Sequence, residues 1–438
     1  MRWFVGAGLL LLVALVFDLG LLAYAMYALL GVMVVSRFLA RVWIENLSAT
    51  RECNRLAASV GDTVAVVVTL QNRGAVPVAW VLSEDLLPHR ALTGNRPCLS
   101  VEGSRLHLAM IQGNGRKTLF YQLQCRRRGY HQIGPLVLET GDLFGLYRRF
   151  RVATEPHFLL VYPEVVPLEG FEIASRRPIG EVRMAHRLYE DPTRIAGVRP
   201  YEAGDPLNRV HWRATARTGA LHSKIYEPSS VAGATIVMDF FQPAYNPHHE
   251  PFRSELAVTA AASIAGALYE MGQQVGLVTN GRDAADRIRQ EGWDFDARSR
   301  SAARKAAEML PHSDRLEPVT VETRRGPEQL MRIRETLARV ELSDGLNLTQ
   351  LLDETLSRLP RDATVLVILP EVTDEAAIAL GNLRRRGFAV SAILNLYDEL
   401  DFARASGRLL AEGIEARHLR DRDAILTICR RWALGITA

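Results

Sequence analysis

The chain has 438 residues, with 53 Lys or Arg against 49 Asp or Glu, so its formal net charge is only +4. This length suits two to three domains, and the balanced charge does not supply the broad basic field that nucleic-acid binding needs. The sequence contains no Walker loop, no GxGxxG, no HExxH and no zinc-binding spacing, which removes the commonest motif-based enzyme classes.

The amino-terminal part of the chain is a long apolar stretch that a single charge interrupts. Residues 3–35 carry only Asp18, which lies near the middle. A bilayer core about 30 Å thick is crossed by roughly 20 helical residues, so the whole stretch is too long for one comfortable span. We therefore predict two short transmembrane helices that form a hairpin over residues 1–43, with the polar turn on the far side. One tilted span is the alternative.

Basic residues after the apolar stretch predict its orientation. Arg37, Arg41 and Arg51 follow it, and such residues are retained on the cytoplasmic side of the plasma membrane. Everything after residue 40 is therefore expected in the cytoplasm, and four scattered cysteines agree with a reducing compartment. A cleaved signal peptide, suggested by the small residues at 23–25, is disfavoured because apolar residues continue for about ten positions beyond them.

The pattern then changes to a period of two, after a short amphipathic linker at 41–56. About seven short strands in roughly 110 residues predict an immunoglobulin-like β-sandwich over residues 44–158. Two distinctive segments, 126–130 and 141–146, are expected to be structural: a charged strand end, and a turn whose Phe144 and Leu146 plug the core. The strands that can be placed lie at 63–70, 78–82, 106–110, 119–125 and 136–139.

Residues 159–230 form a long bridge that is rich in Arg, Pro and Gly and contains one clear helix. Asp205 can cap its start, Pro206 suits the first helical position, and Gly219 suits the left-handed cap after its end. Its apolar edge consists of Leu207, Val210 and Ala214. A basic stripe with a four-residue repeat consists of Arg209, Arg213 and Arg217, and the residues around it are Tyr201, His211, Trp212, Lys224 and Tyr226.

Residues 231–438 alternate between strands and helices, the pattern of a doubly wound, Rossmann-like α/β domain. Nearly continuous apolar runs at 234–240 and 364–369 indicate buried parallel strands. Residues 281–327 are charged and poor in large apolar residues, so we expect an excursion there with one short helix near 301–309. The other predicted elements are strands at 274–279 and 389–394 and helices at 254–272, 328–340, 348–359, 374–386 and 423–432.

The motif at 201–217 resembles the signature of the domain-of-unknown-function family 58, and residues 128–130, 142–146 and 224–227 reinforce the resemblance. The resemblance implies a membrane-anchored cytosolic protein with a carboxy-terminal von Willebrand A-like domain. Such proteins are often encoded beside MoxR-type AAA+ ATPases and other von Willebrand A proteins, and no reaction is implied. The motif residues are Tyr201, Gly204, Asp205, Pro206, Arg209, His211, Trp212, Arg213, Arg217, Lys224 and Tyr226.

A von Willebrand A fold implies a site for a hard cation, in which an Asp after the first strand joins two Ser hydroxyls, a Thr and a second Asp. Here Asp239 takes the first position, but Phe241 and Pro243 stand where the two serines belong. The remaining candidates, which align only loosely, are Glu371, Asp374 and Thr349. We therefore expect a degenerate scaffold without metal or other cofactor. A metal-dependent binding module is the alternative.

An enzyme would have to use the motif, because general acid–base chemistry needs a positioned side chain within hydrogen-bonding reach of its substrate. The motif's candidates are Tyr201, Asp205, His211 and Lys224. Asp205 is better explained as a helix cap, which leaves His211 without an orienting partner. Cys125 and His131 resemble a thiol pair but lack a third member. We predict no enzyme activity, and an enzyme that uses the His211 region is the less favoured alternative.

The basic stripe has two interpretations. As an internal brace it would pair with Glu202, Glu227 or carboxylates elsewhere and fix the bridge to both domains. As a docking surface its guanidinium groups would bind an acidic partner or anionic lipid heads. The prediction for the whole chain is a non-catalytic adaptor or scaffold at the membrane, which presents a von Willebrand A-like surface to protein partners such as a MoxR-type ATPase.

Overall fold

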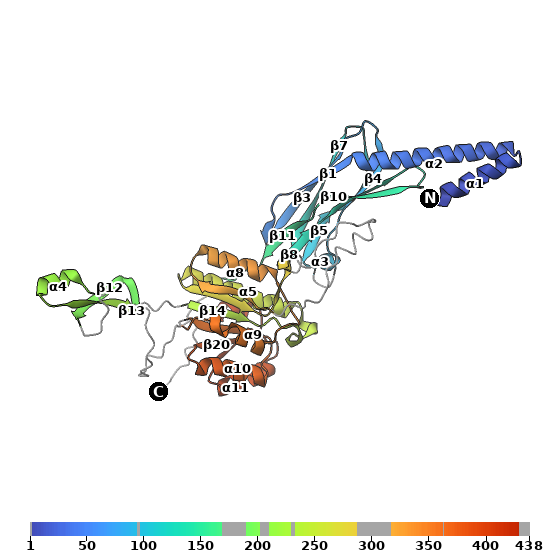
Figure 1. Cartoon of the computed structure of the whole chain (residues 1–438). Coiled ribbons are helices and arrows are strands. Elements are labelled where there is room, and N and C mark those ends of the chain that lie inside the picture. Colours follow the sequence, from blue (N-terminus) through green and yellow to red (C-terminus); the bar gives the residue numbers. More distant parts are fainter. Residues whose placement is uncertain are drawn as a thin grey trace.

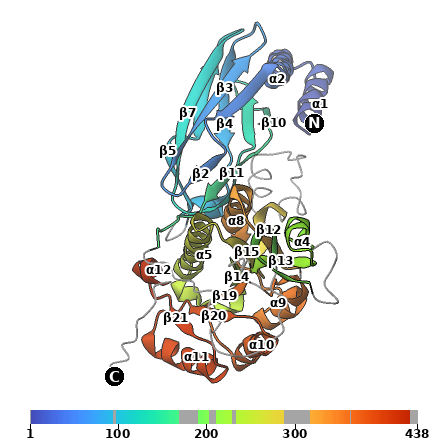
Figure 2. The same ribbon diagram turned by 90° about the vertical axis from the view of Figure 1, so that its left-hand side faces the viewer.

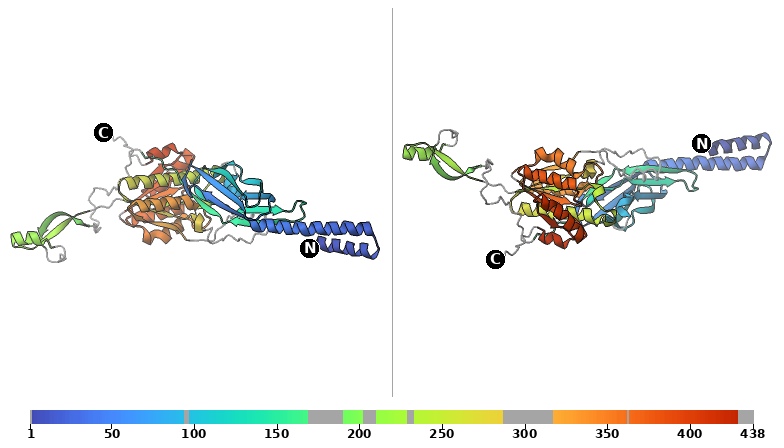
Figure 3. Two further views of the ribbon diagram at one scale, coloured as in Figure 1. Left: turned by 90° about the horizontal axis from the view of Figure 1, so that it is seen from above. Right: turned by 90° about the horizontal axis from the view of Figure 1, so that it is seen from below.

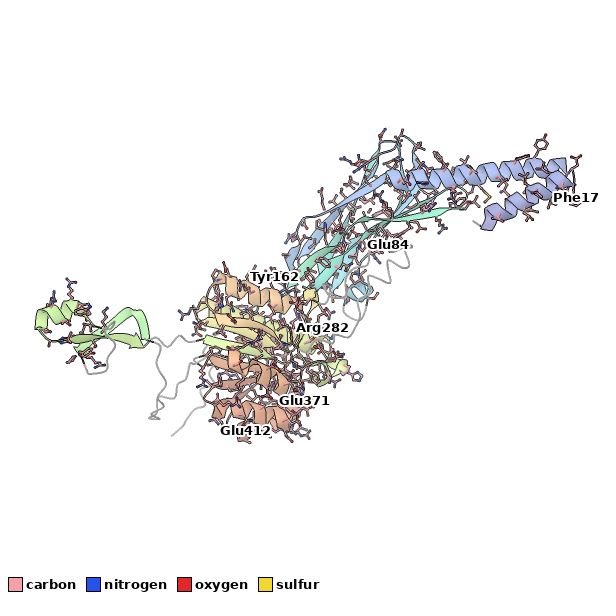
Figure 4. All side chains as sticks on the ribbon, in the orientation of Figure 1. Phe17, Glu84, Tyr162, Arg282, Glu371 and Glu412 are labelled. Carbon is pink, nitrogen blue, oxygen red and sulfur yellow. The ribbon has the colours of Figure 1, made fainter. Side chains whose placement is uncertain are left out.

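Two antiparallel helices form the amino-terminal end of the computed structural model, which describes residues 2–93, 97–168, 190–201, 210–228, 233–286, 317–361 and 363–428. Helix α1 spans Arg2–Val16 and α2 spans Gly20–Asn46, and they lie side by side (Figure 1). Asp18 has a φ of 54° in the tight turn between them, next to Phe17 at the far tip (Figure 4). Small buried residues, among them Ala7, Ala14 and Ala23, let the two backbones approach closely.

The two helices differ in length. Among the described residues, α2 is the helix that is long and apolar enough to cross a membrane, whereas the apolar part of α1 covers Val5–Val16. Large apolar side chains of both helices face outward, including Leu21 and Val35. The predicted pair of helices is therefore present, and the second membrane span stays a prediction.

Helix α2 continues into the β-sandwich without a linker. It runs to Asn46, and strand β1, Leu47–Cys53, follows at once. Trp43 and Ile44 are buried in the core of the sandwich, and the guanidinium of Arg151 donates to the carbonyl oxygens of Ile44 and Leu47 at 3.4 and 3.2 Å. The linker predicted at 41–56 is wrong. Trp43 and Ile44 pack into the core of the sandwich, and the Arg151 guanidinium donates hydrogen bonds to the free carbonyl groups at the end of the helix.

Two four-stranded antiparallel sheets share this core. One has the order β1-β3-β7-β5 and the other β10-β9-β4-β6, and a small third sheet has the order β2-β11-β8. In β3, Thr63–Asn72, buried and half-buried residues alternate, as the sequence predicts. The remaining elements are β2 (Ala57–Ser59), β4 (Val78–Asp85), α3 (His89–Leu92), β5 (Leu99–Gly103), β6 (Leu106–Ile111), β7 (Arg116–Cys125), β8 (Gly129–Ile133), β9 (Leu136–Gly141), β10 (Arg148–Thr154) and β11 (His157–Tyr162). This confirms a β-rich unit, and its immunoglobulin-like class stays a prediction.

The turn between β9 and β10 contradicts its predicted role. Phe144 and Leu146 were expected to plug the core, but both are exposed. The backbone reverses too tightly between the paired strands for these side chains to reach the interior of the sandwich. The predicted plug is therefore wrong, and the turn presents its apolar side chains outward.

A six-stranded sheet forms the centre of the α/β domain, with the order β17-β15-β14-β19-β20-β21 and β17 antiparallel to the rest. Along β14, Gly233–Met238, Ile236 packs against α5 (Phe252–Glu270) and α8 (Pro327–Arg339), while Val237 faces the opposite cluster. Figure 2 shows α5 and α8 on the side of the sheet that faces the sandwich, with α10 and α11 on the other. The doubly wound prediction is confirmed.

Most predicted elements of this domain are present, and the exceptions are short. Strand β17, Val319–Arg324, lies inside the segment expected to be an excursion, and the sequence did not place α11, Glu399–Ala411, or β21, Ala416–His418. The helix predicted at 301–309 lies outside the described residues. The remaining elements are β15 (Gln274–Thr279), β16 (Arg282–Asp283), β18 (Val340–Glu341), α9 (Leu348–Thr355), β19 (Thr364–Leu369), α10 (Asp374–Arg385), β20 (Val390–Leu394), α12 (Asp423–Thr427) and the short 3-10 turns Gln242–Ala244, Pro247–His249 and Leu356–Arg358.

The bridge contains a small separate unit, which we call the arm. It consists of β12 (Glu190–Pro200), α4 (Trp212–Thr218) and β13 (His222–Pro228), and the two strands pair in an antiparallel sheet. Figure 3 shows the arm and the α1–α2 pair at opposite ends of the molecule.

Candidate functional site

Asp239 directly follows β14, at the edge of the sheet where the parallel strands end. Its Oδ1 accepts hydrogen bonds from the Asn280 side-chain amide at 2.7 Å and from the Phe241 backbone N–H at 3.1 Å. The same Asn280 amide donates to the Leu346 carbonyl at 2.9 Å, and its oxygen accepts from the Phe240 N–H at 2.6 Å. These bonds tie together the loops that follow β14 and β15 and the loop that precedes α9.

The charge of Asp239 is poorly compensated. Burial raises the pKa of its carboxyl to about 6, although the bonds from Asn280 and Phe241 favour the charged form, and nearby Glu371 adds to the rise (Figure 4 labels Glu371). Among the described residues Asp239 has no cation partner, so its carboxylate loses more by burial than these two hydrogen bonds return. The charged form of Asp239 is therefore less favoured than that of an exposed aspartate.

The residues around Asp239 do not fit a cation site. Phe241 and Pro243 offer no side-chain oxygen, and one carboxylate oxygen of Asp239 is already committed to two donors. Thr349 lines a groove between α9 and α10, and Asp374 forms an ion pair with Arg408 at 3.0 Å. Among the described residues, no group of three His, Cys, Asp or Glu side chains is arranged to hold a metal ion. With Phe241 and Pro243 in place of the two serines, the chain supplies fewer oxygen ligands here than the predicted cation site requires.

Arg128 joins the sandwich to the α/β domain. Its guanidinium donates to the carbonyl oxygens of Leu337 and Val340, at the end of α8, at 2.6 and 2.8 Å. It also lies 3.4 Å from the Glu255 carboxylate and 5.8 Å from the centre of the Phe240 ring. The segment expected to be a charged strand end is therefore a buried interdomain contact, which we call the joint. All of these partners are more than one hundred positions away in the sequence, so no local pattern could reveal them.

A second contact between the sandwich and α8 supports the joint. The guanidinium of Arg334 lies 5.0 Å from the centre of the Tyr162 ring, at the end of β11 (Figure 4). Cation–π contacts of this kind add about 0.5–1 kcal/mol at partly exposed sites. The sandwich and α8 therefore meet through arginine side chains from both directions.

The arm has a different local structure from the one predicted. Val210 is buried and bridges to Ser223, and the His211 N–H donates to the His222 carbonyl at 2.8 Å. Both residues are therefore extended, and α4 begins only at Trp212. The sequence predicts that the helix begins at Pro206 and includes Val210, and this is wrong for Val210. Its backbone and that of His211 pair with β13, so their hydrogen-bonding groups are not available to a helix. Gly219, with a φ of 73°, confirms the predicted left-handed cap.

His211 caps α4. Its Nδ1 accepts a hydrogen bond from the Ala214 N–H at 3.0 Å, the role predicted for Asp205 at an earlier start. This bond uses the imidazole lone pair, which a general base would need for a substrate proton. In the described geometry the imidazole acts structurally.

The exposed motif side chains gather on α4. Trp212 is 68% exposed, and Arg213 and Arg217 are exposed one helical turn apart on a common face. Neither arginine forms an ion pair with any residue that the structure describes. Glu202 lies outside those residues, as does the side chain of Glu227, so the brace stays a prediction.

The other motif residues occupy the base of the arm or cannot be described. Tyr201 donates its N–H to the Leu221 carbonyl at 2.9 Å, and Lys224 is half-buried on β13. Tyr226 belongs to the backbone of β13. The predicted residues outside the described part of the chain are Gly204, Asp205, Pro206 and Arg209.

The alternative thiol pair is chemically unsuited to catalysis. Burial raises the pKa of Cys125 to about 11, which keeps it a thiol. Burial also lowers the pKa of His131 to about 4, so its imidazole is neutral at physiological pH. A reactive cysteine needs the opposite environment, in which a cation stabilises the thiolate. Cys125 belongs to the core of the sandwich, and His131 is buried on β8.

One family model matches part of the chain. Residues 197–317 match the model of a family described as "Protein of unknown function DUF58", as the motif predicts. The Bacillus subtilis "Uncharacterized protein YeaD" is 25% identical over 298 residues, which are 68% of this chain and 70% of that protein. The family match covers the arm from residue 197 onward and the first part of the α/β domain, and neither description states an activity.

Two solved structures resemble a quarter of the chain. The CARDB domain of a Pyrococcus furiosus protein is 10% identical with a TM-score of 0.18, and covers 26% of this chain and 94% of that one. A PapD-like domain of human CEP192 is 13% identical with a TM-score of 0.17, and covers 25% of this chain and 82% of that one.

Proposed function

We propose that this chain is a non-catalytic adaptor, held at a membrane by α1 and α2, which binds a protein partner through the exposed face of α4. The observation that carries the proposal is the contrast within one motif. His211 is committed to capping α4, whereas Trp212, Arg213 and Arg217 point away from the fold. A motif that exposes its tryptophan and arginines while using its histidine structurally suits recognition better than turnover.

The side chains on α4 favour an acidic protein surface as the partner. Trp and Arg are the residues most enriched among interface hot spots. Two guanidinium groups one turn apart can each form paired hydrogen bonds with a carboxylate, which a point charge such as Lys does not do. The arm lies at the end of the molecule opposite α1 and α2 (Figure 3), so a partner could reach it without meeting the bilayer.

The membrane part of the proposal uses both helices. If α1 and α2 cross as a hairpin, Arg37 and Arg41 follow the second span and are expected on the cytoplasmic side. The sandwich, the arm and the α/β domain then lie in the cytoplasm. The exposed apolar side chains of α1 and α2 would otherwise face water, which supports this arrangement.

The strand order of the α/β domain supports the proposal that this domain is a von Willebrand A-like scaffold. Counted from β14, its strand order is 3-2-1-4-5-6 with the third strand antiparallel, and an aspartate follows the first strand. A MoxR-type AAA+ ATPase is the partner to test first, since the family resemblance implies that neighbourhood. The alternatives are a metal-dependent version of the same module and, less favoured, an enzyme that uses the His211 region.

The test compares matched arginine variants of the full chain in nanodiscs. The Arg213→Ala/Arg217→Ala pair should weaken binding of a MoxR-type ATPase from the same organism by roughly tenfold or more, since hot-spot truncations cost about 2 kcal/mol. Arg404→Ala, an exposed arginine on α11, is the control and should leave the affinity unchanged. Equal affinities for all three proteins would contradict the docking surface, and a lower melting temperature of the double variant would favour the brace.

A further inference from the structure

The turn between β9 and β10, residues 142–147, exposes three large apolar side chains, and we call it the apolar turn. Leu143 is 65% exposed, Phe144 68% and Leu146 49%. Single apolar residues scattered over a surface are ordinary. Three in so short a segment form a patch, and such patches usually mark a contact with a protein, a membrane or a ligand. The adaptor function proposed above does not use this turn.

The conformation of the turn is fixed from within. The Asp142 carboxylate accepts hydrogen bonds from the Phe144 and Tyr147 backbone N–H groups at 3.0 and 2.6 Å. The Trp80 indole donates to the Asp142 carbonyl at 3.3 Å, and Gly145 takes a φ of 74° that favours glycine. Asp142 itself is buried. The turn therefore holds its apolar side chains outward in one arrangement.

The apolar turn lies against α2. The Ser36 hydroxyl lies near the Asp142 carboxylate and helps to lower its pKa, and Ser36 is buried, although its neighbour Val35 is exposed. Helix α2 also runs beside β9 and β10 (Figures 1 and 2). Ser36 ends the apolar run of α2, and Arg37 follows it. The apolar turn is therefore level with the point where α2 would leave the bilayer.

Basic residues lie behind the apolar tip. Arg148 and Arg149 follow the turn and are exposed, and Arg37 and Arg41 lie on the adjacent part of α2. Apolar side chains in front of arginines are the pattern of segments that enter the headgroup region of an anionic membrane.

We propose that the apolar turn inserts into the leaflet from which α2 emerges and is a further membrane contact of the chain. The partner is the headgroup and acyl boundary of an anionic bilayer, and the proposal rests on the membrane anchoring proposed above. Arg151 and the buried Trp43 fix α2 to the sandwich, so a second contact beside α2 would set the tilt of the sandwich on the membrane. The arm, at the opposite end, would then extend away from the bilayer.

The test uses a photoreactive residue at three positions of the full chain in nanodiscs that contain anionic lipid. The variant Phe144→benzoylphenylalanine probes the turn. Phe120→benzoylphenylalanine, on β7 and 52% exposed, is the matched water-facing control. Tyr27→benzoylphenylalanine, in the apolar part of α2, reports on the anchor itself. After illumination, lipid adducts on each protein are measured by mass spectrometry.

We expect lipid adducts at Phe144 to exceed those at Phe120 by roughly tenfold and to approach those at Tyr27, as for a segment inserted at the interface. Adducts at Tyr27 with none at Phe144, or a crosslink from Phe144 to a second protein chain, would overturn the insertion while leaving the anchor intact. Absence of adducts at Tyr27 would overturn the membrane anchoring on which both proposals rest.

Discussion

Asp85 in the sandwich and Asp239 in the α/β domain are both buried carboxyl groups, but they have different partners. Asp85 lies 2.6 Å from the Arg51 guanidinium and accepts a hydrogen bond from the Tyr121 hydroxyl at 2.7 Å. Asp239 accepts from the Asn280 amide and one backbone N–H, and among the described residues it has no cation partner. The two domains therefore bury the same functional group in opposite ways.

The difference lies in how the negative charge is compensated. Burial raises the pKa of both carboxyl groups, and in Asp85 the neighbouring Arg51 and the Tyr121 hydroxyl oppose the rise. In Asp239 only neutral donors oppose it, and its pKa reaches about 6. The sandwich thus contains a fixed ion pair that depends on both partners. The α/β domain contains an acid whose ionisation costs stability at neutral pH.

Removing the cation from the sandwich pair should have the largest effect. In Arg51→Met, Asp85 remains buried without its partner, which typically costs about 3–5 kcal/mol of unfolding free energy. The Glu155 carbonyl would also lose its donor. Thermal unfolding of the detergent-solubilised chain measures the loss. Arg55→Met is the control, because its ion pair with Asp62 is exposed and should change stability by less than about 1 kcal/mol.

The double variant Arg51→Met/Asp85→Leu separates a lost pair from a stranded charge. If the cost comes from the uncompensated carboxylate, the double variant should recover much of the stability that the single variant loses. A double variant as unstable as Arg51→Met would instead assign the cost to packing around the arginine.

Neutralising Asp239 should have the opposite sign. Its folded pKa lies above its unfolded value, so its contribution to stability is fully present below the unfolded pKa and is lost as the pH rises through about 6. Asp239→Asn removes this loss while keeping an acceptor for Asn280 and Phe241. We expect the variant to gain up to about 3 kcal/mol over wild type near pH 8, and this gain should disappear below about pH 3. Thermal unfolding across this pH range is the measurement.

Magnesium ions provide the control for the same variant. A metal-dependent module would bind Mg²⁺ through the Asp239 carboxylate, so the ion would stabilise wild type and not Asp239→Asn. Isothermal titration with Mg²⁺ and Mn²⁺ should detect no binding to either protein if Asp239 serves only its loops. Micromolar binding to wild type that Asp239→Asn abolishes would show that Asp239 belongs to a metal site.

The regular parts of both domains could be predicted from the sequence because their patterns are strong. The alternation in β3 predicts a strand with one buried face, and the continuous apolar runs of β14 and β19 predict strands buried on both faces. Strand β17 was missed because it is a short edge strand with charged residues facing solvent. Phe144 and Leu146 were misplaced because an apolar turn has the same sequence whether it faces the core or the outside.

The candidate sites were less predictable because long-range pairing decides them. Asp205 and Pro206 are good local signals for a helix start, but the bonds from Val210 and His211 to β13 delay α4 to Trp212. The partners of Arg51 and Arg128 are likewise set by the fold, and a lone arginine in a strand or turn gives no sign of them. The composition shows that positive and negative charges nearly balance over the whole chain. It does not show which of these charged residues are buried.

Arg128 offers a third arrangement, in which a buried cation meets backbone carbonyls and one partly exposed carboxylate. Arg128→Met would leave the Leu337 and Val340 carbonyls without donors, at a cost of about 2 kcal/mol, smaller than for Arg51 because solvent can enter the interface. The loss should fall on the contact between the domains, so calorimetry should resolve two transitions where wild type has one. Arg126→Met is the control, because Arg126 belongs to the same run of three arginines and is exposed. One unchanged transition would mean that the Arg334–Tyr162 contact and apolar packing suffice to hold the joint.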